Sequence, residues 1–90
     1  WRKGLPAEAA SELQRAIDLR PGEAAPHYYL GEALHQAGDI GGAKAALERA
    51  IALDESDARP FQLLGRILDR LKRPEEARAM YERARAARRP

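Results

Sequence analysis

The 90-residue sequence contains no cysteine, which excludes disulfide bonds, thiolate metal sites and cysteine nucleophiles. Aromatic residues are scarce, with one tryptophan, one phenylalanine and three tyrosines, so a core must consist mainly of aliphatic and alanine side chains. No apolar run approaches the roughly 20 residues that cross a bilayer, and the pattern of a signal peptide is absent. We therefore expect no membrane insertion and a cytoplasmic location for this segment.

The sequence carries a small net charge that is unevenly distributed. It has 16 basic and 14 acidic residues. Residues 1–57 have a balance of −4 and residues 58–90 a balance of +6. A basic end favours acidic partners by electrostatic steering. Nucleic acid is not the expected partner, because the arginines of this end lack the interleaved aromatic residues on which single-strand binders stack bases. The predominance of arginine over lysine, with abundant alanine, is typical of a GC-rich bacterial genome.

A shift of 34 residues aligns the sequence with itself. The positions that match in three copies are Leu13, Leu47 and Tyr81; Ala9, Ala43 and Ala77; and Ala16, Ala50 and Ala84. Those that match in two copies are Pro26 and Pro60, Leu30 and Leu64, Gly31 and Gly65, and Leu34 and Leu68. A period of this length indicates stacked units, none of which can bury its apolar face alone.

Helical spacing of apolar residues predicts five helices, at residues 7–19, 25–37, 41–53, 58–71 and 74–88. The connections are short, so consecutive helices are antiparallel. Gly31 and Gly65 lie within helices, where glycine costs about 1 kcal/mol relative to alanine. This cost indicates a close helix crossing at each glycine. Ser56 or Asp57 is expected to cap the fourth helix, and the turn at 72–74, which lacks glycine, is expected to be tighter than the turn at Gly38.

The spacing of six residues resembles the tetratricopeptide repeat, W-x2-L-G-x2-Y, then A-x3-F, then A and P. These residues are Leu30, Gly31, Leu34, Ala43, Leu47 and Ala50. The resemblance implies an all-α fold, an α-solenoid of antiparallel helix hairpins forming a superhelix of about two and a half repeats. Residues 1–90 are then one array, with a partial repeat at 1–23, a full repeat at 24–57 and a near-full repeat at 58–90.

Nothing in the sequence indicates catalysis. No nucleophile lies beside a base in a known hydrolase pattern, and no glycine loop follows a strand to hold phosphate. His27 and His35 are eight residues apart on one helix, which rotates them roughly 80° from each other, so they cannot easily share a metal ion. We expect a buried His27, an exposed His35, no cofactor, no metal site and no enzyme activity.

The resemblance also implies that the first helix of each unit lines a concave groove. The residues predicted to face it are Ala25, Tyr28, Glu32, His35 and Gln36, followed by Arg59, Gln62, Arg66, Asp69 and Arg70. Aromatic and arginine side chains are favoured anchors at interfaces, and arginine suits carboxylates. Some family members hold the terminal carboxylate of a chaperone peptide here, but Tyr29 and Leu63 replace the expected asparagine and basic residue. We therefore predict no chaperone-tail binding.

The function predicted from these features is a protein–protein interaction module that binds a peptide or partner helix, with an acidic partner favoured. The alternative is a non-catalytic helical arm of a larger bacterial enzyme or secretion factor, used for dimerisation or substrate presentation. The chain begins within a repeat, so we expect a longer parent protein. Both ends are expected to lack caps and to support homo-oligomerisation, through Leu13 and Ile17 at one end and Met80 and Tyr81 at the other.

Overall fold

A computed structural model describes residues 5–88, which form helices and no strands. The five helices are α1 (Leu5–Leu19), α2 (Ala24–Gln36), α3 (Ile40–Leu53), α4 (Ala58–Arg70) and α5 (Pro74–Arg88). The prediction of an all-α fold with five helices is confirmed, with boundaries that differ by one or two residues. The ends of the predicted units 1–23 and 58–90 lie outside the described residues, and the division into those units stays a prediction.

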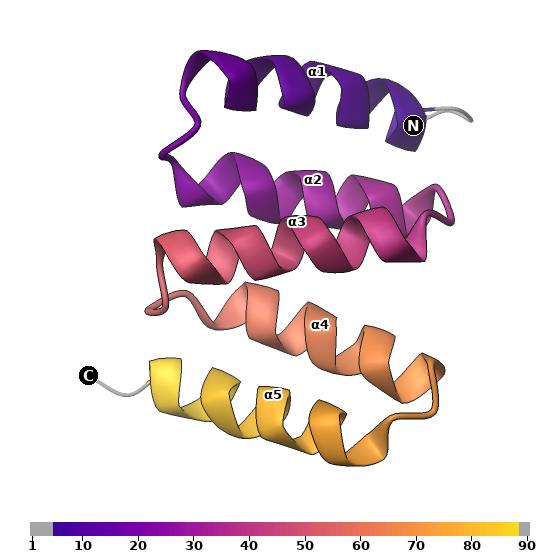
Figure 1. The fold of residues 1–90 in the computed structure, drawn as a ribbon, viewed down its shortest axis with the longest axis vertical. Coiled ribbons are helices and arrows are strands. Elements are labelled where there is room, and N and C mark those ends of the chain that lie inside the picture. Colours follow the sequence, from indigo (N-terminus) through magenta and orange to yellow (C-terminus); the bar gives the residue numbers. More distant parts are fainter. Residues whose placement is uncertain (1–4, 89–90) are drawn as a thin grey trace.

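The helices stack in the order of the sequence, each running antiparallel to its neighbours (Figure 1). α2 packs most extensively on α3, and α4 on α5, so these pairs are the hairpins of the repeat. α2 also contacts α1 and α4. α2 and α4, the first helices of their hairpins, therefore lie next to each other, which is where the predicted groove residues are.

In each hairpin, the two helices approach each other closely at a glycine. A Cβ built on Gly31 would lie 2.7 Å from the Cγ and Cδ2 atoms of Leu47, and one built on Gly65 would lie 2.7 Å from the Tyr81 ring. Because ordinary carbon contacts need more than 3 Å, the two helices could not approach this closely with a side chain at either glycine. The prediction that Gly31 and Gly65 mark close crossings is confirmed.

The two hairpin turns have the same backbone geometry. Gly38 has φ +91° and Lys72, one repeat later, has φ +62°. The amide after Gly38 donates to the carbonyl of Leu34 at 2.8 Å, and the amide after Lys72 donates to that of Leu68 at 2.9 Å. The prediction of a tighter second turn is therefore wrong. Lys72 takes the left-handed conformation instead, which costs an L-residue about 1–2 kcal/mol.

Two aspartates cap helices. The Asp39 carboxylate accepts a hydrogen bond from the amide of Gly42 at 2.9 Å, and the Asp57 carboxylate accepts one from the amide of Arg59 at 3.0 Å. Both satisfy amides that the first turn of a helix leaves unpaired. Of the two caps proposed for α4, Asp57 is the one that forms. Asp57 also brings a carboxylate to the start of the predicted groove.

Candidate functional site

The predicted residues converge on a groove between α2 and α4. The groove has a volume of about 440 Å³ and is lined by Glu32, His35, Gln36, Leu63, Arg66 and Arg70. Five of these six residues were predicted from the sequence. Leu63, the sixth, was not among the predicted groove residues and was noted only because it replaces a basic residue of chaperone-binding family members. It is 4% exposed and supplies the apolar part of the groove wall.

The basic side chains of this groove come from α4. Arg66 and Arg70 are exposed. The ion pairs found within residues 5–88 include neither of them. Nη1 of Arg70 lies 3.2 Å from Nε2 of His35. Partial burial, together with the charges of Arg70 and Arg66, lowers the pKa of His35 and so favours the neutral ring, whose Nε2 can accept this hydrogen bond. The groove is thus positively charged on its α4 side.

Tyr28 lies below the surface of the groove. It is 8% exposed, and its hydroxyl donates to the Glu32 carboxylate at 3.0 Å. Burial, followed by this hydrogen bond, raises the pKa of Tyr28 to about 12. Tyr28 therefore holds Glu32 in place and offers a partner little surface of its own.

Arg59 joins α4 to α2 through contacts within the chain. Its Nη2 atom lies 2.9 Å from the Asp57 carboxylate, and its Nη1 atom donates to the Tyr29 hydroxyl at 3.1 Å. The guanidinium also lies 4.6 Å from the centre of the Tyr28 ring, within the range of a cation–π contact. Hydrogen bonding to Asp57 raises the pKa of Arg59, so the guanidinium stays charged, and the nearby negative charge of the Asp57 carboxylate offsets its positive charge.

The remaining predicted residues lie apart from the groove. Asp69 accepts a hydrogen bond from the Tyr81 hydroxyl at 2.9 Å and lines a separate depression against α5. Gln62 is half-buried and is not part of the groove lining. Ala25 is exposed at the start of α2. The groove is therefore lined by residues from the second halves of the predicted α2 and α4 faces, whereas Arg59 and Tyr28 in the first halves contact each other.

His27 is buried as expected, whereas His35 is half-buried and not exposed. His27 is 8% exposed, and its Nε2 atom lies 3.3 Å from the carbonyl oxygen of Pro21, which ties α2 to the turn that precedes it. Within residues 5–88, no group of three or more His, Cys, Asp or Glu side chains is placed to hold a metal ion. In the same range, no helix combines the length and the hydropathy needed to span a bilayer.

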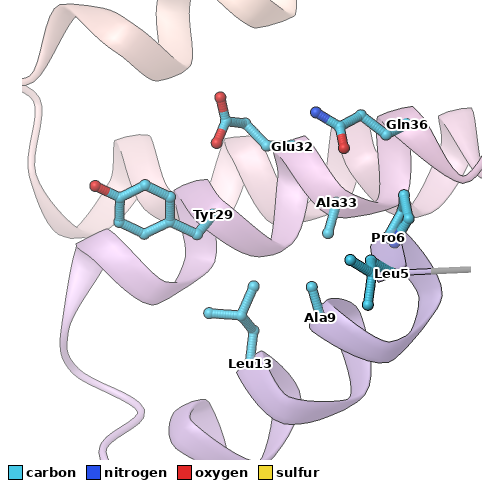
Figure 2. Close-up of a pocket in the computed structure, with 8 residues that line it drawn as sticks. All are labelled: Leu5, Pro6, Ala9, Leu13, Tyr29, Glu32, Ala33 and Gln36. Carbon is cyan, nitrogen blue, oxygen red and sulfur yellow. The ribbon is translucent and has the colours of Figure 1, made fainter. Parts of the chain in front are cut away.

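A second depression, of about 220 Å³, lies between α1 and α2. Figure 2 shows Ala9 and Leu13 directed from α1 toward α2, with Ala33 directed back toward α1. Glu32 and Gln36 line this depression as well as the groove, so the two hollows share one stretch of α2. Ile17, expected to be available at this end, is instead 7% exposed because it packs with Leu30 and Ala46.

Stacked antiparallel hairpins that close on glycine, with a groove along their first helices, define a helical-repeat interaction scaffold. The tetratricopeptide repeat model matches residues 1–67 and 34–90, and the chain belongs to this family. The predicted resemblance is confirmed. A comparison with curated proteins gives no match.

Solved structures with the same fold include crystal structures of MamA. One shares 30% identity with a TM-score of 0.88, covering 94% of this chain and 50% of that one. Another shares 31% identity with a TM-score of 0.88, covering 93% of this chain and 46% of that one. A third, described as MamA MSR-1 C2, shares 18% identity with a TM-score of 0.83, covering 91% and 47%. The chain thus spans about half the length of these proteins.

Proposed function

We propose that this chain is a protein-interaction module that binds an extended acidic peptide segment in the groove between α2 and α4. The observation that carries the proposal is the pair Arg66 and Arg70, which flank the groove without a carboxylate partner in the described part of the chain. Family membership supports the coarser statement that the chain is a scaffold for protein binding.

The groove favours a peptide that places an acidic residue next to an apolar one. Each guanidinium offers a planar fork of donors that matches a carboxylate, and Arg70 is already oriented by His35. Leu63, in the α4 wall, is the apolar residue of the groove lining. Because Arg66 and Arg70 follow each other by four residues, they lie on one side of α4 and can contact the same extended segment.

Arg66 and Arg70 are better anchors than Arg59. The Arg59 guanidinium already forms an ion pair with the Asp57 carboxylate, so the acidic group of a partner would have to compete with Asp57. Tyr28, Arg59, Gln62 and Asp69 remain predicted contacts, and we assign them secondary roles in holding the groove walls. The enzyme-arm alternative also remains a prediction.

A peptide-display selection tests this proposal. The purified chain selects peptides from a random library, and the affinity of an enriched, fluorescently labelled peptide is measured by anisotropy. We expect enriched sequences to contain Asp or Glu near an apolar residue. The double substitution Arg66→Glu and Arg70→Glu should weaken binding at least about tenfold, since a hydrogen bond to a charged group contributes about 1.5–3 kcal/mol.

The matched control is Arg78→Glu with Arg85→Glu, which makes the same change of charge on exposed α5 arginines away from the groove. This control should keep the affinity within about threefold at 0.15 M salt, where exposed charges beyond roughly 8 Å are largely screened. Equal losses in both double variants would show a non-specific charge effect. Selected peptides without acidic residues would refute the acidic-partner proposal.

A further inference from the structure

Two opposite charges line the groove between α2 and α4 without pairing. Glu32 belongs to the α2 wall and Arg66 to the α4 wall. In the described part of the chain, no ion pair includes either of them, so the groove holds the two charges apart. A carboxylate and a guanidinium that are separated by an open groove can each bind the opposite charge of a ligand that lies between them.

The two side chains lie at the same height along the groove. α2 and α4 are each antiparallel to α3, so they run in the same direction (Figure 1). Nη1 of Arg70 lies 3.2 Å from Nε2 of His35, on the opposite wall. Arg66 precedes Arg70 by four residues and Glu32 precedes His35 by three, which is about one helical turn in both cases. Arg66 therefore lies opposite Glu32, as Arg70 lies opposite His35.

A hydrogen bond from below the groove holds Glu32 in position. The buried Tyr28 hydroxyl donates to Oε2 of Glu32 at 3.0 Å. The raised pKa of Tyr28, about 12, keeps this hydroxyl protonated and therefore a donor at neutral pH. Because a carboxylate has two oxygens and several acceptor sites, Glu32 can accept a second hydrogen bond from a cation in the groove. Glu32 is thus an oriented acceptor in the wall that faces the two arginines.

An extended peptide matches the spacing of these arginines. Arg66 and Arg70 are about 6 Å apart along the axis of α4, at 1.5 Å per residue. In an extended chain, side chains two residues apart are separated by about 6.6–6.8 Å and point the same way, while the side chain between them points to the other side. Two acidic side chains at alternate positions can therefore meet Arg66 and Arg70 while the middle side chain points to the α2 wall beside Glu32.

We propose that the groove recognises an extended acidic–basic–acidic triplet, in which Glu32 binds the basic side chain and Arg66 and Arg70 bind the acidic ones. This inference rests on the proposed function, because it assigns the charge pattern of the acidic peptide. A wholly acidic segment would place a carboxylate against Glu32, where like charges repel. Complementary charges on both walls therefore select alternating charge over negative charge alone.

Four fluorescently labelled peptides separate this pattern from net charge. Their central triplets are Glu-Lys-Glu, Glu-Glu-Lys, Glu-Gln-Glu and Glu-Glu-Glu, each between two leucines that offer Leu63 an apolar contact in either chain direction. The first two peptides have the same composition and the same net charge. Anisotropy titrations with the whole 90-residue chain at 0.15 M salt measure the affinities.

We expect Glu-Lys-Glu to bind at least about threefold more tightly than each of the other three peptides, which is the gain of a partly exposed ion pair. Attraction to the basic wall alone would instead rank the affinities by negative charge, with Glu-Glu-Glu first. The comparison with Glu-Glu-Lys removes net charge from the question, since only the order of the residues differs.

Two variants of the chain locate the basic side chain of the peptide. Glu32→Gln removes the negative charge and keeps an oxygen that accepts from the Tyr28 hydroxyl. Glu48→Gln makes the same change at an exposed position of α3 outside the groove lining. Glu32→Gln should bring the affinities for Glu-Lys-Glu and Glu-Gln-Glu within about 1.5-fold of each other, whereas Glu48→Gln should keep the preference of about threefold or more. Melting curves by circular dichroism check that both variants fold as the parent does.

Two results would overturn this inference and leave the proposed function standing. One is that any of the other three peptides binds as tightly as Glu-Lys-Glu, while the double substitution Arg66→Glu and Arg70→Glu still weakens binding. The other is a preference for Glu-Lys-Glu that survives Glu32→Gln. If no peptide binds at millimolar concentration, or if the double arginine variant binds all four as the parent does, both the proposed function and this inference are wrong.

Discussion

Gly31→Ala is the most direct test of how the hairpins close. The new Cβ would lie 2.7 Å from both Cγ and Cδ2 of Leu47 and 3.4 Å from the carbonyl oxygen of Ala43. Leu47 is 0% exposed, so its branch point cannot swing away. Overpacking of this kind costs about 1–3 kcal/mol. The gain in helix propensity is about 1 kcal/mol. We expect a net loss of about 1 kcal/mol, which lowers the melting temperature of a domain of this size by about 4–8 °C.

The control is Gly41→Ala. Gly41 is also in a helix, but a Cβ built on it meets nothing within 4 Å. Here only the propensity gain applies, so this variant should be unchanged or more stable, by up to about 1 kcal/mol. Urea unfolding followed by circular dichroism at 222 nm measures both variants, and equal m-values would show that the unfolded states are comparable.

A double-mutant cycle identifies the atom group that resists the Gly31 substitution. Leu47→Ala alone should cost about 2–5 kcal/mol because it opens a cavity at a fully buried position. In that background the Cβ at position 31 enters the vacated space, so Gly31→Ala should be neutral or stabilising, with a coupling of at least about 1 kcal/mol. The reasoning is refuted if the two changes add within about 0.5 kcal/mol, or if Gly31→Ala stabilises as Gly41→Ala does.

Two further predictions concern α4 and its turn. Hydrogen bonding to Arg59 holds the pKa of Asp57 below its ordinary value of 3.8, so the ionised carboxylate stabilises the fold above about pH 4 and this stabilisation is lost as the pH falls through the lowered pKa. Asp57→Asn keeps a capping oxygen without the charge, so its melting temperature should be lower at pH 7 and should fall less than that of the parent between pH 5 and pH 2.5. Lys72→Gly removes a left-handed lysine at φ +62° and should raise the free energy of unfolding by about 0.5–1 kcal/mol in urea titrations. A lower value for Lys72→Gly would show that the lysine side chain itself stabilises the turn.

The helices and their crossings could be predicted from the sequence because both depend on spacing along the chain. The period of 34 residues places Gly31 opposite Leu47 and Gly65 opposite Tyr81 once the hairpins form. The turn at Lys72 could not be predicted in the same way. Lys72 adopts this conformation because it lets the amide of Arg73 donate a hydrogen bond to the carbonyl of Leu68 at the end of α4. A lysine at this position does not indicate such a conformation in the sequence.

The sequence predicted which helix face the candidate site residues share, but it did not predict the hydrogen-bonding partners of those residues. Spacings of three and four residues correctly placed Arg66 and Arg70 on one side of α4. The same rule grouped Arg59 and Asp69 with them, but Arg59 pairs with Asp57, and Asp69 accepts a hydrogen bond from the Tyr81 hydroxyl of α5. A helix face is fixed by local geometry, whereas the choice of a hydrogen-bonding partner depends on which neighbouring helix is within reach.

One stretch of α2 lines both the groove and the hollow between α1 and α2. Glu32 and Gln36 line both hollows, and the equivalents one repeat later are Arg66 and Arg70. The groove therefore has an acidic or neutral wall on α2 facing a basic wall on α4, which orients an acidic segment toward α4. Because coupling between two binding events is reciprocal, a ligand in the hollow that shifted Glu32 or Gln36 and so changed peptide affinity in the groove would have its own affinity changed by the peptide by the same factor.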